Sequence, residues 1–125
     1  VKRLMIYIKP VALMQIANYL FNDLKCRYVI ESAMDSKKGY EIIYHFSDDN
    51  SGWILNLNAI IPREKPEIES LTQIVKGAEW IEREIFDLLG IKFLHHPNLK
   101  RFLFAESWPE NEFPFRRKNS WESKK

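Results

Sequence analysis

Three consecutive apolar runs separated by short polar turns constrain the fold of this chain most. The runs cover residues 27–33, 40–46 and 53–60, and they are rich in β-branched and aromatic residues, as strands are. Residues 37–39 follow the first run and residues 48–52 follow the second, and both segments have the Gly, Asn, Asp, Ser or Lys content of turns. Strands joined by turns this short pair with their neighbours in the chain, so the sequence predicts an antiparallel meander.

Two amphipathic helices are expected, one before and one after this meander in the chain, and both are predicted to cover the same face of the sheet. Pro10 suits the first turn of a helix that runs to about residue 25. The apolar positions predicted to face the core from this helix are Val11, Met14, Ala17, Leu20, Phe21 and Leu24. A second helix is predicted over 78–89, followed by Gly90 in the left-handed position that often ends a helix. A short strand is expected over 4–8 and a short helix over 67–75.

These elements predict an α+β fold class. A chain of 125 residues with 46% apolar residues is long enough to bury one core. We therefore expect residues 1–99 to form a two-layer domain in which a mostly antiparallel sheet is packed by helices. Residues 100–125 follow neither the helical nor the strand period, and are predicted to form an extended C-terminal arm. The arm holds 7 basic and 4 acidic residues, two prolines and five aromatic residues beyond Phe102.

The 78–89 helix carries a regular pattern of charges. Glu79, Arg83 and Asp87 are four residues apart, so the pattern predicts an exposed stripe on which neighbouring charges pair. Glu82 and Glu84 could be mistaken for a catalytic pair of carboxylates. They lie two positions apart, however, and therefore point about 200° away from each other on a helix. The sequence excludes them as a local acid–base pair.

The sequence offers no recognisable cofactor site. An iron–sulfur cluster takes about four thiolate ligands, whereas Cys26 is the only cysteine and is expected to be a small buried residue. The four glycines lie at turns and helix breaks, outside any phosphate-binding motif. His95 and His96 are adjacent and should point to opposite sides, which disfavours a shared metal ion. His96 is instead expected to donate a hydrogen bond that fixes the segment after the helix. We therefore expect the chain to bind no metal, flavin or nucleotide.

The order of residues from 78 to 103 resembles a known family. The matching motifs are Glu82-Arg83-Glu84, Asp87-Leu88-Leu89-Gly90-Ile91, Phe93, His96-Pro97 and Lys100-Arg101. They resemble the 30 kDa (C) subunit family of respiratory complex I, which also supplies a small subunit to membrane-bound, energy-converting nickel–iron hydrogenases. The resemblance continues more loosely through Trp108-Pro109 and residues 114–117. The chain departs from the family pattern at Phe102, Phe115 and Lys118.

The resemblance implies a non-catalytic structural subunit of the peripheral arm of a membrane-bound redox complex. Its implied partners are the large catalytic subunit and the iron–sulfur subunit, which carry iron–sulfur clusters and, in a hydrogenase, nickel–iron. Trp108-Pro109 and the short chain favour an energy-converting hydrogenase, which passes electrons from ferredoxin to protons and couples this to ion translocation. The alternative is the corresponding small subunit of a quinone-reducing complex I, an NADH or ferredoxin dehydrogenase. The implied location is the cytoplasmic side of the cell membrane, with membrane contact only through partner subunits.

Exposed aromatic residues on a proline-containing arm are unfavourable in water and commonly mark a docking surface. The rings from Phe113 to Trp121 are expected to dock on another chain, whereas for those from Phe102 to Trp108 the alternative is that they fold back onto the sheet of the same domain. The residues expected at the subunit interface are Glu82, Arg83, Glu84, Asp87, His96, Pro97, Arg101, Trp108, Pro114, Phe115, Arg116 and Arg117.

Two other classes of function stay open. Residues 116–118 with the neighbouring rings could form a small nucleic-acid-binding module, although a net charge of only +2 favours no nucleic-acid partner. A stand-alone enzyme would need a catalytic site that the sequence does not display.

Overall fold

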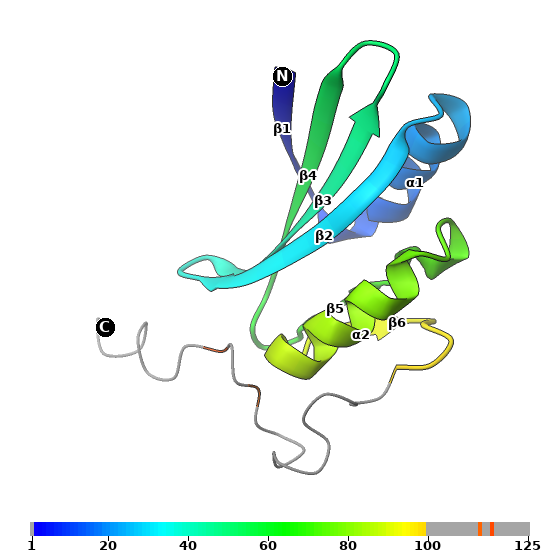
Figure 1. Cartoon of the computed structure of the whole chain (residues 1–125). Helices are drawn as coiled ribbons and strands as arrows, with labels where there is room; N and C mark the ends of the chain where they lie inside the picture. Colours follow the sequence, from blue (N-terminus) through cyan, green and yellow to red (C-terminus); the bar gives the residue numbers. More distant parts are fainter. Residues whose placement is uncertain (1, 100–112, 114–115, 117–125) are drawn as a thin grey trace.

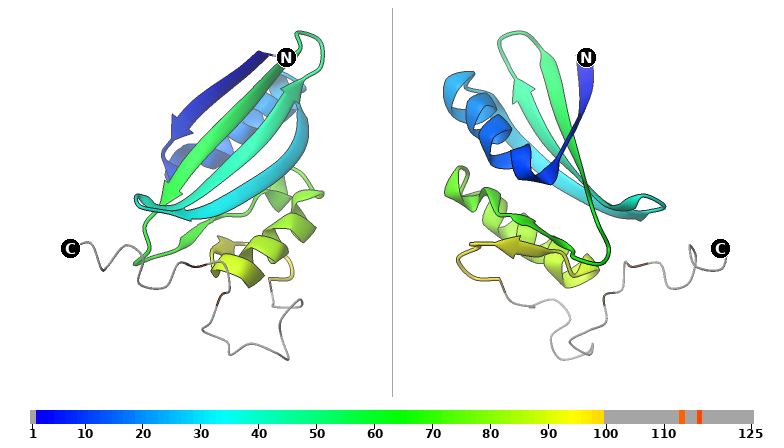
Figure 2. Two further views of the ribbon diagram at one scale, coloured as in Figure 1. Left: turned by 60° about the vertical axis from the view of Figure 1, so that its left-hand side comes forward. Right: turned by 180° about the vertical axis from the view of Figure 1, so that it is seen from behind.

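The computed structural model of the chain describes residues 2–99, 113 and 116. It contains a four-stranded sheet with the strand order β1-β4-β3-β2, and the helices pack on one face of that sheet (Figures 1 and 2). In chain order the elements are β1 (Lys2–Ile8), η1 (Pro10–Ala12), α1 (Leu13–Asn18), η2 (Tyr19–Asp23), β2 (Arg27–Ser36), β3 (Gly39–Asp48), β4 (Trp53–Ile61), β5 (Glu67–Glu69), η3 (Leu71–Gln73), α2 (Ala78–Leu89) and β6 (Lys92–Leu94). The predicted two-layer α+β class is confirmed.

The predicted meander is also confirmed. Strands β2, β3 and β4 are joined by short turns and pair antiparallel in chain order. Strand β1 pairs with β4 in parallel, with Leu4 opposite Leu55, so the first strand lies at one edge of the sheet. The segment η1–α1–η2 then crosses the sheet and delivers the chain to β2 at the opposite edge (Figure 2).

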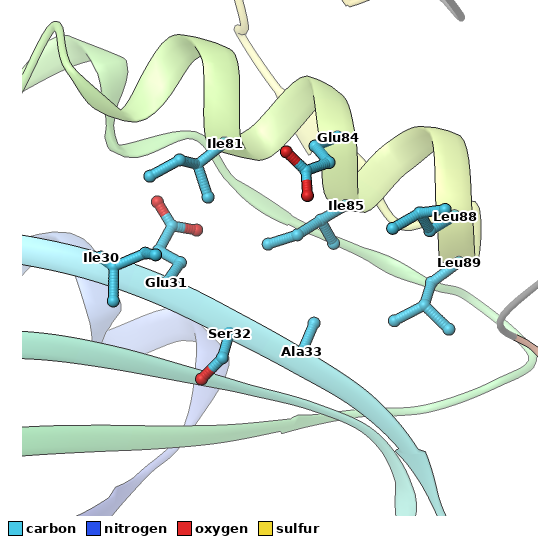
Figure 3. Close-up of a pocket in the computed structure, with 9 residues that line it drawn as sticks. All are labelled: Ile30, Glu31, Ser32, Ala33, Ile81, Glu84, Ile85, Leu88 and Leu89. Carbon is cyan, nitrogen blue, oxygen red and sulfur yellow. The ribbon is translucent and has the colours of Figure 1, made fainter. Parts of the chain in front are cut away.

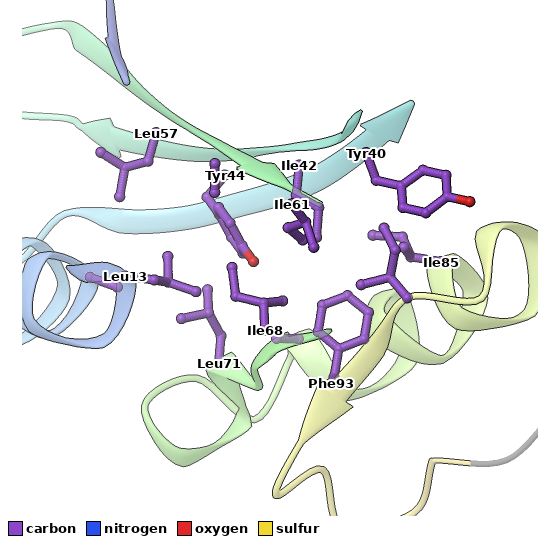
Figure 4. Packing of buried hydrophobic residues seen from close by; sticks show 14 of the residues in the cluster. Leu13, Tyr40, Ile42, Tyr44, Leu57, Ile61, Ile68, Leu71, Ile85 and Phe93 are labelled. Carbon is purple, nitrogen blue, oxygen red and sulfur yellow. The ribbon is translucent and has the colours of Figure 1, made fainter. Parts of the chain in front are cut away.

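The core lies between the sheet and the helices. Alternate residues of β3 point inward and are buried, namely Tyr40, Ile42, Tyr44 and Phe46. They meet buried side chains from other elements, among them Leu13, Leu57, Leu71, Ile85 and Phe93 (Figure 4). The period-two alternation of β3 therefore sets which face of the sheet the helices cover.

The first helical segment differs from the prediction at both ends. Val11 is 91% exposed and Leu24 is 46% exposed, whereas Leu13 is fully buried. The segment begins as a 3₁₀ turn and ends as a π-helix, so the number of residues per turn changes along it. A single helical period therefore places the central residues Ala17 and Leu20 correctly and the terminal ones wrongly.

The short helix predicted over 67–75 is wrong in its first half. Glu67–Glu69 forms β5, which pairs in parallel with β6, and only Leu71–Gln73 is a 3₁₀ helix. The two strands are separated in the chain by α2, so the pairing that defines them is not visible in local sequence. This small sheet and α2 form the lower part of the domain in Figure 1.

Candidate interface around helix α2

Helix α2 begins and ends where the sequence predicts. It covers Ala78–Leu89 and stops at Gly90, whose φ of 77° lies in the left-handed region. The Gly90 N–H donates to the Phe86 carbonyl at 2.8 Å. Glycine adopts this backbone conformation without steric cost, so Gly90 allows the chain to turn sharply from α2 into β6.

Glu82 is a polar group at the centre of the domain, not on its surface. Its side chain is fully buried. Its two carboxyl oxygens accept hydrogen bonds from the Ser70 hydroxyl at 2.6 Å and from the Leu71 N–H at 2.8 Å. These bonds tie α2 to the start of η3. The family motif placed Glu82 at an interface with another subunit, but here its carboxyl group contacts residues of its own domain.

A second buried carboxyl group, that of Glu31 on β2, is close enough to Glu82 for the two charges to interact. It is 3% exposed, and one of its oxygens accepts a hydrogen bond from the Tyr28 hydroxyl at 2.9 Å. Burial raises the pKa of Glu82 to about 7. Burial, and then the charge of Glu82, raise the pKa of Glu31 well above its usual range. The two carboxyl groups therefore favour bound protons at mildly acidic pH, because burial disfavours the charged form of each.

Three other charged residues of α2, Asp87, Arg83 and Glu84, differ in how far they are buried and in what they contact. Asp87 is fully buried, which corrects the expectation of an exposed charged stripe. The prediction failed because α2 lies between β2 and β6, so more than one of its faces is covered (Figure 1). The Arg83 guanidinium lies 5.7 Å from the centre of the Trp80 ring. Glu84 is exposed, so Glu82 and Glu84 point in different directions, as predicted.

His96 fixes the segment after the helix, as predicted. Its Nδ1 accepts a hydrogen bond from the Asn98 N–H at 3.0 Å, which leaves the ring proton on Nε2. Nε2 then donates to the Glu79 carbonyl at 3.0 Å. The neighbouring His95 side chain is 66% exposed and that of His96 is 0% exposed, so the two rings point to opposite sides. Pro97 is exposed beside them.

Arg116 of the predicted arm was expected at the interface with another subunit, and here it contacts its own domain directly. Its Nε donates a hydrogen bond to the Leu89 carbonyl at 2.6 Å, at the C-terminal end of α2. Its guanidinium lies 4.5 Å from the centre of the Phe113 ring and 5.3 Å from that of Tyr40. A cation at this end of a helix complements both the free carbonyl groups and the helix dipole. The other predicted arm residues, Arg101, Trp108, Pro114, Phe115 and Arg117, lie outside the described residues, as does nearly all of the proposed 100–125 segment.

Sequence reasoning missed Glu31 and the partners of Glu82. Glu31 stands at an inward position of β2, in alternation with the half-buried Ala33 and the buried Asp35. That alternation was a usable signal, because a carboxyl group on the inner face of a strand must find a partner in the core. Ser70 carried no such signal, since its role depends on how η3 packs against α2.

The described residues show neither a metal centre nor a membrane span. Residues 2–99, 113 and 116 bring together no group of three or more His, Cys, Asp or Glu side chains that could hold a metal ion. No helix within this part of the chain is long and apolar enough to cross a membrane.

Sequence comparisons identify relatives among the subunits of NADH-quinone oxidoreductases and of an F(420)H(2) dehydrogenase. Over 111 residues, or 84% of this chain, it is 30% identical to the C subunit of the NADH-quinone oxidoreductase of Roseiflexus castenholzii, of which the match covers 64%. It is 38% identical over 73 residues both to the C/D subunit of that enzyme in Phocaeicola vulgatus and to the C subunit of the F(420)H(2) dehydrogenase of Methanosarcina mazei. These two matches cover 58% and 55% of this chain, and 14% and 46% of the relatives. The chain thus spans less than two thirds of these curated relatives.

Two solved structures share the fold. A chain of the archaeal membrane-bound sulfane sulfur reductase superposes with a TM-score of 0.78 at 20% identity, covering 93% of this chain and 71% of that chain. The trypsin-resistant fragment of Nqo5 superposes with a TM-score of 0.66 at 22% identity, covering 78% and 83%. The family model described as the 30 kDa subunit of respiratory-chain NADH dehydrogenase matches residues 6–125. This match spans nearly the whole chain, and the chain therefore belongs to the family of the 30 kDa subunit of respiratory-chain NADH dehydrogenase.

Proposed function

We propose that this chain is a non-catalytic structural subunit in the peripheral arm of a complex I-like, membrane-bound redox complex. The proposal rests on the hydrogen bonds that polar residues of the family motif make within the domain. Glu82 binds η3, His96 binds the backbone of α2, and Arg116 binds the end of the same helix. These polar groups connect α2 to neighbouring segments of the same domain. We expect the surface that they hold to change little on binding, as the interfaces of preorganised complexes do.

The proposed partners are the large catalytic subunit and the iron–sulfur subunit of the same complex. They would carry the iron–sulfur clusters, and this chain would contact the membrane only through them, on the cytoplasmic side. Support comes from the relatives, which are named as C subunits of an NADH-quinone oxidoreductase and of an F(420)H(2) dehydrogenase. Arg116 argues against the nucleic-acid alternative, because its guanidinium is already engaged by Leu89 and two aromatic rings.

Two versions of the complex remain candidates. The Trp108-Pro109 motif favours an energy-converting hydrogenase, in which ferredoxin would supply electrons to protons and ion translocation would be coupled to the reaction. The names of the curated relatives favour a quinone-reducing complex instead. The difference lies in the active site of the large subunit, and it can therefore be measured there.

The test is to purify the intact complex through an affinity tag on this chain and to analyse its metals and subunits. We expect a large catalytic subunit and an iron–sulfur subunit to copurify. Nickel at about one ion per complex would select the hydrogenase, and quinone reduction without nickel would select the alternative. The tagged chain alone should hold no iron or flavin. A stoichiometric cluster or flavin on the isolated chain would contradict a purely structural role.

A second expected outcome concerns the arm. Replacing Trp108, Phe115 and Arg117 together by alanine should weaken binding to the large subunit by more than roughly 30-fold, because aromatic and arginine residues are the usual interface anchors. Phe113 and Arg116 are kept, so the contacts with α2 that stabilise the domain remain. Binding is measured by titrating the purified chain onto the large subunit, with thermal unfolding as the control for folding. Undiminished binding would show that the interface lies elsewhere.

A further inference from the structure

A groove runs between β2 and α2. It encloses about 240 Å³ and is mainly apolar. Glu31 and Ala33 point into it from β2, and Ile81, Ile85 and Leu88 line it from α2 (Figure 3). Glu84 stands at its rim. Both charged residues that line the groove are acidic.

Strand β2 leaves one edge of the sheet available beside this groove. It pairs only with β3 in the described part of the chain, so the backbone groups on its other side face away from the sheet. After a bulge near Val29, the strand keeps regular register from Ile30 to Ser36. Natural proteins commonly protect such edges with lysine, proline, bulges or inward-pointing charged residues. Of these devices the regular part of β2 has only the inward-pointing Glu31 and Asp35, and it exposes Ile30 and Met34 by 47% and 48%.

The carboxyl group of Glu31 has one oxygen that needs a hydrogen-bond donor. One of its oxygens accepts the Tyr28 hydroxyl at 2.9 Å. The other is buried and has no hydrogen-bond partner among the described residues. Figure 3 shows the carboxyl group directed from β2 toward Ile81 of α2, into the groove. Burial favours the protonated form of this carboxyl group, and a cationic donor supplied at the unpartnered oxygen would instead stabilise its ionised form.

We propose that this groove binds an extended segment of a partner subunit, in which a lysine or arginine is flanked by aliphatic residues. The segment adds to the sheet beside β2 and takes its main-chain hydrogen bonds from that edge. Its aliphatic side chains fill the space between Ala33 and Ile85. Its cationic side chain lies between Glu84 at the rim and the unpaired oxygen of Glu31. The inference rests on the proposed function, because it supplies a second contact between this chain and the same complex.

The first measurement is hydrogen exchange on the complex purified through this chain and on the free chain. The amides of residues 30–36 that point away from β3 should exchange at least tenfold more slowly in the complex. Glu84→Lys should lower the yield of copurified partner at least tenfold by repelling the cationic side chain. The matched control is Glu64→Lys, an equal charge reversal at an exposed loop position, which should leave the yield unchanged. Both positions are exposed, so both variants should fold.

The second measurement identifies the occupant. A photoreactive phenylalanine in place of Ile30 should crosslink, in the intact complex, to a partner peptide that holds a lysine or arginine beside aliphatic residues. A crosslink to residues 117–125 of this chain, to a second copy of it, or to an acidic peptide would overturn the inference. Copurification of the large subunit with equal exchange of residues 30–36 in both states would overturn the inference and leave the proposed function standing. If no redox subunit copurifies, both fail.

Discussion

Replacing Glu82 by alanine is expected to lower the free energy of unfolding by about 2–4 kcal/mol at pH 5. The change removes the acceptor for the Leu71 N–H and one of the two side-chain partners of the Ser70 hydroxyl, the other being Thr72 Oγ1 at 2.6 Å. Ser70 and Leu71 are both fully buried. A buried donor left without an acceptor loses the hydrogen bonds that it would make to water in the unfolded chain. The missing side chain also leaves a cavity between α2 and η3. Urea unfolding followed by circular dichroism measures the effect.

The loss should shrink as the pH rises. Burial raises the pKa of Glu82 from an ordinary value of 4.5 to about 7. Between these two values the folded chain binds more protons at this residue than the unfolded chain does. Stability from this group is therefore fully present below about pH 4.5 and decreases as the pH rises to about 7. The raised pKa of Glu31 acts in the same direction.

Two variants check this account. Glu82→Gln keeps the volume and one acceptor oxygen but cannot ionise, so its unfolding free energy should fall less between pH 5 and pH 8 than that of the unmodified chain. Glu84→Ala alters an exposed carboxyl group of the same helix and should change stability by less than about 0.5 kcal/mol. If the unfolding free energy of Glu82→Gln fell as much between pH 5 and pH 8 as that of the unmodified chain, Glu82 would not be the group whose ionisation causes the decrease.

The sequence predicted those helices and strands whose formation depends on residues close together in the chain. The bounds of α2 follow from its apolar spacing and from Gly90, and the β2–β3–β4 meander follows from strand runs joined by short turns. The small β5–β6 sheet escaped prediction because its strands of three residues exist only through pairing across α2. The π-helical end of the first helical segment was not predicted, because the number of residues per turn changes within that segment.

The candidate site was predicted less well than the fold, for a physical reason. A glutamate or aspartate in an amphipathic helix is normally exposed, so Glu82 and Asp87 were expected on the surface. Whether such a residue is buried depends on donors that come from distant segments, as Ser70 and Leu71 do for Glu82. The capping of α2 by Arg116 is likewise a contact between residues far apart in the chain. His96 was expected to fix the segment after the helix, and it does so through the nearby Asn98 N–H and through the Glu79 carbonyl at the start of α2, an acceptor that the sequence did not identify.

Gly90→Ala is expected to destabilise the domain by about 2–4 kcal/mol, which is more than the cost of the backbone conformation alone. The φ of Gly90 is +77°, and a residue with a Cβ atom loses about 1–2 kcal/mol there. The added Cβ atom would also lie 2.5 Å from Nη2 of Arg116 and 2.6 Å from the Phe113 ring. Both side chains would have to move, and the hydrogen bond from Arg116 to the Leu89 carbonyl would be lost with them.

Two other glycines of the chain separate these contributions. Gly52 has a φ of +80° with no atom within 4 Å of an added Cβ, so Gly52→Ala measures the backbone cost alone. Gly77 has a φ of −61° and a nearest atom at 3.9 Å, so Gly77→Ala should be neutral or stabilising by up to about 1 kcal/mol. Gly90→Ala should therefore exceed Gly52→Ala by at least about 1 kcal/mol in thermal or urea unfolding. In an Arg116→Ala, Phe113→Ala background the clash is absent, and this excess should disappear. An excess that persists in that background would show that the clash with Arg116 and Phe113 is not its cause.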